Sequence, residues 1–140
     1  MPRLELNAAL LLAKLSLKVY YILSLKLFIN KVYLFTDSQV VLAWLKTNPV
    51  KLNTYVANRI KAISEYTRDF NWLYVTTSLN PADCLSRGVS PSELHSHELW
   101  WSGPPVMSNL DYTFSDNCNF EIPTNLPEIK FSVSNRQVCA

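Results

Sequence analysis

Apolar and polar residues alternate in blocks over the first 88 positions, and the blocks predict a domain of mixed helices and strands. Residues 4–26 are mostly apolar, follow Pro2 and contain no further proline and no glycine, which predicts one long helix. The later blocks predict, in chain order, a strand at 31–36, helices at 39–46 and about 51–66, a strand at 71–76 and a helix from Asn80 to Gly88. This order of helix, strand, two helices, strand and helix is typical of an α/β domain whose neighbouring strands are parallel.

Local residue types support several of these elements. Residues 31–36, KVYLFT, are β-branched and aromatic on both faces, as in a strand that is buried on both sides. Asn80 is expected to cap the last helix with Pro81 at its first position, and Gly88 to end it. The helix at 51–66 places four apolar side chains on one stripe: Leu52, Val56, Ile60 and Ile63.

The long N-terminal helix raises the question of a membrane segment. Its longest charge-free run, residues 6–13, has eight residues, whereas a helix that spans a bilayer needs about 20. No small-residue cleavage site follows a clean apolar core, as a signal peptide requires. We therefore expect a buried helix whose edge carries Lys14 and Lys18, which lie four residues apart on one face. An amphipathic helix at a membrane surface is the alternative.

Composition excludes several classes of protein. The 140 residues suffice for one domain with a core, or for a small domain with a tail. Two glycines, Gly88 and Gly103, cannot build a glycine-rich phosphate loop. Three cysteines without a CxxC pair (Cys84, Cys118 and Cys139) indicate reduced thiols in an intracellular protein rather than a disulfide framework.

Charge and proline are unevenly distributed along the chain. Residues 1–88 carry 11 Lys and Arg against 5 Asp and Glu, whereas residues 89–140 carry 2 against 6. Five of the eight prolines also follow residue 88. We therefore predict a mildly basic globular domain at 1–88 and an acidic, proline-rich and mostly irregular connector at 89–140, with residues 106–140 largely unfolded.

Acidic residues are rare in the first 88 positions, and three of them lie at the ends of predicted helices or strands. Asp37 ends the first strand, Asp83 lies in the first turn of the helix after the second strand, and Glu5 lies in the first turn of the long helix. If the two strands are neighbours, these carboxylates meet at one edge of the sheet, where oxygen ligands suit Mg²⁺. Each also has an ordinary explanation, as a helix-dipole charge at Asp83 and Glu5 and as a turn former at Asp37.

The two histidines offer a weaker candidate for chemistry. His95 and His97 have no cysteine partners at the spacing of a zinc site. We therefore expect both of them to be exposed residues of the connector.

Several sequence words resemble those of one family. The segment TDSQVVLAWL is similar to the third-carboxylate segment of ribonuclease H domains, where a strand ends in Thr-Asp-Ser and leads into a helix. Other segments resemble ribonuclease H domains of BEL/Pao-type retrotransposon polyproteins and the connector that follows them. In chain order the segments are PRLEL (2–6), TDSQVVLAWL (36–45), YVANRI (55–60), NPADCLSRG (80–88), ELWWSGPP (98–105) and NFEIPTNLPEIK (119–130).

The resemblance implies a two-metal nuclease that cuts the RNA strand of an RNA/DNA hybrid. It implies that Glu5 and Asp37 hold the Mg²⁺ ion at the leaving group and that Asp83 holds the ion that activates water. Ser38 and Gln39 would lie near the minor groove of the hybrid, where contacts are independent of sequence. It further implies an upstream reverse transcriptase and a downstream integrase as partners, and a location in the cytoplasm or in virus-like particles rather than at a membrane.

The chain also departs from the family pattern. In the family, the first carboxylate and three strands precede the PRLEL segment, whereas this chain begins at Met1 and Pro2. Residues 76–79 read Thr-Thr-Ser-Leu where the family tends toward a Pro-Gly-Lys-like turn. The fold class we expect is therefore a truncated ribonuclease H-like α/β fold. We expect the chain by itself to be inactive. The alternatives are a non-catalytic remnant that binds nucleic acid or polyprotein partners, and a helical protein at a membrane surface.

Overall fold

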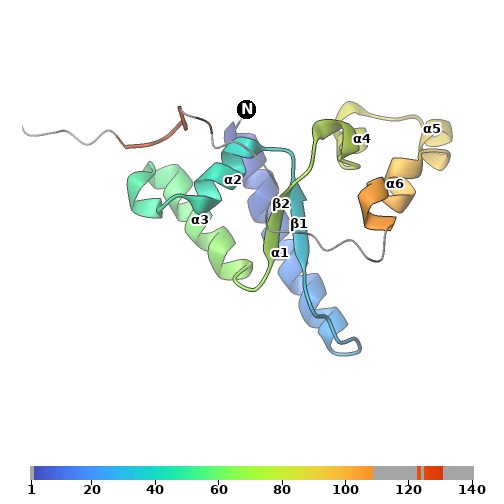
Figure 1. Ribbon diagram of the computed structural model, residues 1–140, viewed down its shortest axis with the longest axis horizontal. Helices are drawn as coiled ribbons and strands as arrows, with labels where there is room; N and C mark the ends of the chain where they lie inside the picture. The colour runs from blue at the N-terminus through green and yellow to red at the C-terminus, as the bar shows by residue number, and fades with distance from the viewer. Residues whose placement is uncertain (1, 109–122, 124, 131–140) are drawn as a thin grey trace, which may run out of the picture.

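The computed structural model describes residues 2–108, 123 and 125–130, and it is a mostly helical α/β structure (Figure 1). Among the described residues, the 3₁₀ turns Pro49–Lys51 and Thr77–Leu79 join longer elements, and the 3₁₀ turn Pro105–Ser108 follows α6. The helices and strands are α1 (Pro2–Ser24), β1 (Tyr33–Thr36), α2 (Gln39–Lys46), α3 (Thr54–Tyr66), β2 (Asn71–Tyr74), α4 (Asp83–Arg87), α5 (Pro91–His95) and α6 (Glu98–Ser102).

Within the described residues, β1 and β2 form a parallel two-stranded sheet, as the order of elements predicts. Tyr33 lies opposite Asn71, and the backbone N–H of Asn71 donates to the carbonyl of Val32 at 2.9 Å. Parallel pairing follows because α2 and α3 carry the chain back from the end of β1 to the start of β2. The expectation that β1 is buried on both faces is wrong, since only Leu34 is buried and its neighbours are half-buried.

The core lies between α1, α2 and α3. All four members of the predicted stripe at 51–66 are buried, with α3 itself beginning at Thr54. Helix α2 adds Val41 and Trp44, and α1 adds Leu6, Ala9 and Ala13. Complete burial of a large apolar side chain contributes about 1.5–3 kcal/mol, so this cluster provides the main stabilisation of the domain.

Helix α1 is buried along a narrow stripe only. The spacing of Leu6, Ala9 and Ala13 places them on one face, and the two small alanines let α3 approach closely. The opposite face exposes apolar side chains by more than 40%, among them Leu4, Leu11, Leu15, Val19 and Ile22. The expectation of a buried helix with a lysine edge is therefore wrong for most of its length. Among the described helices, α1 alone is long and apolar enough to cross a membrane, a test that the core helix of a soluble protein also passes.

Residues 126–130, here called the strap, lie against the first half of the chain (Figure 1). Ile129 forms an antiparallel bridge with Leu52, and the indole N–H of Trp44 donates to the carbonyl of Pro127 at 2.9 Å. Leu126 packs against the core cluster. The prediction that residues 106–140 are largely unfolded does not hold for the strap, whereas residues 109–122, 124 and 131–140 lie outside the described part of the chain.

We expect Ile60→Ala to lower the free energy of unfolding by about 2–5 kcal/mol, because it leaves a cavity at the centre of the core. Urea denaturation followed by circular dichroism measures this change. Ile22→Ala is the matched control, since Ile22 is 57% exposed on α1 and its truncation removes few contacts. Equal losses in the two variants would contradict the assignment of the core.

Candidate functional site

The turn after β1 is built around Ser38. Its hydroxyl caps α2 by accepting a hydrogen bond from the backbone N–H of Val41 at 3.2 Å. Its own backbone N–H donates to Oγ1 of Thr36 at 3.2 Å. This Thr-Asp-Ser turn fixes the start of α2 and places Asp37 directly after the carboxyl end of β1, with Gln39 exposed at the first position of the helix.

The structure brings Glu5 to this turn. The Ser38 hydroxyl donates to Oε2 of Glu5 at 2.5 Å, while it accepts from Val41 on its other side. One hydroxyl proton and two lone pairs satisfy both contacts. The first turn of α1 therefore lies at the carboxyl end of β1, where the sequence pattern predicted that Glu5 and Asp37 would meet.

Asp83 is held within its own helix. Its Oδ2 forms an ion pair with Nη2 of Arg87 at 2.9 Å, and its Oδ1 accepts from the hydroxyl of Ser86 at 3.2 Å. These partners lie three and four residues further on, on the same face of α4. Both oxygens of this carboxylate are thus engaged locally.

The start of α4 differs from the prediction. Helix α4 begins at Asp83 with Ala82 as its N-cap, and not with Asn80 as the cap and Pro81 as the first residue. The side chain of Asn80 instead accepts from the backbone N–H of Ala82, which forms a turn before the helix. Gly88 ends α4 with φ +77°, in the left-handed region, as predicted.

A metal centre of three ligands is not formed by the described residues, among which no group of three His, Cys, Asp or Glu side chains could hold an ion. Glu5 and the Asp37–Ser38 turn offer oxygen ligands of the kind that Mg²⁺ prefers. Asp83 fits less well, because the Arg87 guanidinium that it contacts would repel a cation. The structure thus joins two of the three predicted segments and leaves Asp83 paired elsewhere.

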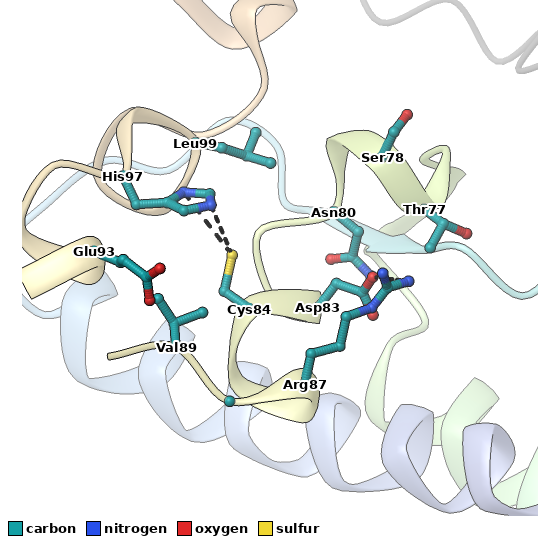
Figure 2. Close-up of a pocket in the computed structure, with 11 residues that line it drawn as sticks. Thr77, Ser78, Asn80, Asp83, Cys84, Arg87, Val89, Glu93, His97 and Leu99 are labelled. Atoms are coloured by element: carbon teal, nitrogen blue, oxygen red, sulfur yellow. Dashed lines mark hydrogen bonds and ion pairs between the residues drawn. The ribbon is translucent and has the colours of Figure 1, made fainter. Parts of the chain in front are cut away.

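Asp83 borders an open pocket of about 700 Å³ that residues of the Thr77–Leu79 turn, α4, α5 and the start of α6 line (Figure 2). Cys84 and His97 point toward one another across it, with Sγ 3.4 Å from Nε2. The Nδ1 atom of His97 accepts from the backbone N–H of Trp100 and caps α6. A neutral ring with an accepting Nδ1 carries its proton on Nε2, so His97 donates to the thiol of Cys84.

The expectation that both histidines are exposed is confirmed for His95 but wrong for His97, which is half-buried and contacts Cys84. Spacing along the chain gives no signal for this contact, because it arises only after α5 turns the chain back. The turn is set by Ser90, whose hydroxyl accepts from the backbone N–H of Glu93 while its own N–H donates to the Glu93 carboxylate. Hydrogen bonds from the Ser90 side chain and backbone lower the pKa of Glu93.

A third polar cluster lies where the strap meets α1 and the start of α3. The Glu128 carboxylate accepts from Nε of Arg3 at 2.7 Å and from Nδ2 of Asn53 at 2.8 Å. The guanidinium of Arg3 lies 4.8 Å from the centre of the Tyr55 ring, and that of Arg59 lies 3.5 Å from it. Hydrogen bonds lower the pKa of Glu128, the one from Asn53 more than the one from Arg3.

Comparison with known proteins does not assign a family. No protein family model matches the chain, and no curated protein and no solved structure is significantly similar to it.

We expect Ser38→Ala to lower the free energy of unfolding by about 0.5–2 kcal/mol, because α2 loses its cap and Glu5 loses a donor. Ser38→Thr keeps the hydroxyl and is expected to recover most of the loss. The exposed Ser64→Ala in α3 serves as the matched control, and it should be neutral or slightly stabilising. Chemical denaturation of the three variants tests this, and a neutral Ser38→Ala would show that the turn does not need its hydroxyl.

Docking of the strap should depend on pH. The pKa of Glu128 is lower in the docked state than its ordinary value of about 4.3. The ionised carboxylate therefore stabilises the docked strap fully above the ordinary pKa, and this stabilisation is lost as pH falls through the lowered pKa. The indole N–H resonance of Trp44, which reports its bond to Pro127, should shift accordingly. Glu128→Gln should remove this acid transition, and an unchanged transition in that variant would assign it to another group.

Proposed function

We propose that this chain is part of a ribonuclease H-like domain from a BEL/Pao-type retrotransposon polyprotein, with residues 89–140 as the connector toward the integrase. The parent domain cleaves the RNA strand of RNA/DNA hybrids. The hydrogen bond between Ser38 and Glu5 carries the proposal, because it holds the PRLEL segment at the Thr-Asp-Ser turn. Parallel pairing of β1 and β2 supports it further, since the carboxyl ends of both strands then lie at one edge of the sheet.

The chain's own residues have distinct tasks in this proposal. Glu5 and Asp37 would hold one Mg²⁺ ion, and Asp83 would hold the second after it separates from Arg87. Two such ions supply an activated water and stabilise the leaving oxygen of the RNA backbone. Ser38 orients the Glu5 carboxylate, and the exposed amide of Gln39 is available to the minor groove of the hybrid.

The exposed face of α1 supports a fold with more strands than the described two. An apolar groove of about 440 Å³ lies between the second half of α1 and β1, lined by Leu15, Val19 and Leu34 among others. In the proposed ribonuclease H-like fold, the three strands that precede this segment would extend the sheet over α1. One of those strands carries the first carboxylate, so we expect this chain alone to bind the hybrid without cleaving it.

The second candidate is a non-catalytic remnant that binds nucleic acid or other parts of the polyprotein. The ion pair between Asp83 and Arg87 favours it, because a carboxylate neutralised by its own helix is a poor metal ligand. A membrane-surface role is the third candidate, and the apolar length of α1 and its exposed apolar face favour it. Sedimentation with lipid vesicles tests the third candidate directly.

When the upstream strands are supplied, we expect Mg²⁺-dependent cleavage that Asp37→Asn or Asp83→Asn lowers by about a hundredfold or more, because the metals lose their position. Affinity for the hybrid should change little, because phosphate contacts come from Lys and Arg. The control is Asp69→Asn, an exposed carboxylate in the turn before β2. The assay follows a labelled RNA strand in the hybrid.

Each other outcome points to a different candidate. A completed domain that binds the hybrid but never cleaves it would favour the non-catalytic remnant. Cleavage that survives both substitutions would remove Asp37 and Asp83 from the catalytic residues. Efficient cleavage by this chain alone would show that the upstream carboxylate is not needed.

A further inference from the structure

We propose that Arg3 and Asn53 form a binding site for a backbone phosphate of nucleic acid, and that Glu128 of the strap occupies this site as an internal competitor. The choice of nucleic acid as the ligand rests on the proposed function. The site itself rests on the contacts of three side chains.

The donors of this site converge on an anion. Arg3 reaches Oε1 of Glu128 through both Nε and Nη2, at 2.7 and 2.6 Å. Asn53 reaches Oε2 through Nδ2 at 2.8 Å, so both carboxylate oxygens are bound. A planar guanidinium together with an amide N–H can bind two oxygens of a phosphate in the same way.

The surroundings of the site also suit a nucleic-acid backbone. The side chain of Arg3 is 57% exposed although Glu128 contacts it, so a ligand can approach from solvent. Arg59 lies over the same Tyr55 ring as Arg3 and adds a second positive charge. Arg3 and Glu5 lie in the first turn of α1, so the phosphate site and the proposed catalytic edge both lie at the amino-terminal end of this helix.

The strap has the features of a segment that can detach. Glu128 has φ +64°, a left-handed conformation that non-glycine residues rarely adopt, and its contacts hold it there. The other attachments of the strap are the bridge between Ile129 and Leu52, in which the backbone N–H groups of Asn53 and Lys130 donate to the carbonyls of Glu128 and Lys51, the bond from Trp44 to Pro127, the bond from Nζ of Lys130 to the carbonyl of Val50, and the packing of Leu126. Binding of a phosphate by Arg3 would remove the ionic part of this attachment.

The test compares Glu128→Gln with Glu98→Gln, which removes the same charge from an exposed position on α6. Affinity for an RNA/DNA hybrid, measured by fluorescence anisotropy at low salt, should rise about three- to tenfold in Glu128→Gln only. The slope of log Kobs against log salt should stay close to that of the wild type in Glu128→Gln, because Arg3 contacts a phosphate in the bound state of both proteins. The double variant Arg3→Gln/Glu128→Gln should lose the gain in affinity, and its slope should be shallower by about one, because the phosphate contact of Arg3 is gone.

A second readout follows the strap itself. Addition of the hybrid to the wild-type chain should shift the indole N–H resonance of Trp44, as release from Pro127 requires. The indole N–H of Trp72, which donates to Thr67 away from the strap, provides an internal reference.

Equal affinities of the Glu128→Gln and Glu98→Gln variants would overturn the proposal. If neither variant binds the hybrid, both the phosphate-site proposal and the proposed function fail. If both bind equally well, the proposed function stands and only the competing role of Glu128 fails. A Trp44 resonance that stays in place at saturating hybrid would show that the strap remains docked, and would likewise overturn the proposal.

Discussion

The close approach of α1 to α3 determines where the polar clusters at the start of the molecule lie. Leu6, Ala9 and Ala13 face α3, and the small side chains of the two alanines keep the helices close. Three polar residues in the first two turns of α1, spaced two apart along the chain, then reach three different partners. Arg3 reaches the strap, Glu5 reaches Ser38, and Asn7 accepts a hydrogen bond from Arg59 at 2.7 Å. A single apolar contact thus positions both the turn where Glu5 meets Ser38 and the proposed phosphate site at Arg3.

Sequence patterns predicted the order of the elements in residues 1–88, because these elements depend on local periodicity and caps. They did not predict α5 and α6, which form in the segment expected to be mostly irregular. Helix α2 spans the predicted residues, since Ser38 caps its start and Asn48-Pro49 follows its end. The arrival of Glu5 at the end of β1 was also predictable, because a first-turn acid and a strand end are both visible in the sequence. The contact of Cys84 with His97 and the docking of the strap were not predictable, because each joins distant residues without any repeating pattern.

Asp83 shows how local and distant electrostatics compete. The pattern placed it among three converging carboxylates, yet the structure pairs it with Arg87 one turn further along α4. A partner four residues away on a helix requires little ordering of the chain, whereas a shared metal must compensate the repulsion between carboxylates. Without an ion, the local pair is the favourable arrangement. Movement of Arg87 away from Asp83 is therefore the rearrangement that a catalytic role demands and that a purely binding role does not.

The composition changes at Gly88, but contacts cross that position. His97 reaches back to Cys84, and the strap reaches α1, α2 and the start of α3. The opposite net charges of residues 1–88 and 89–140 explain part of this attachment, since an acidic segment is attracted to a basic domain. The same attraction places Glu128 on Arg3, where a nucleic acid would also bind. In the proposed function, an acidic connector that follows a basic domain would thus be both its covalent continuation and a competitor for its phosphate contacts.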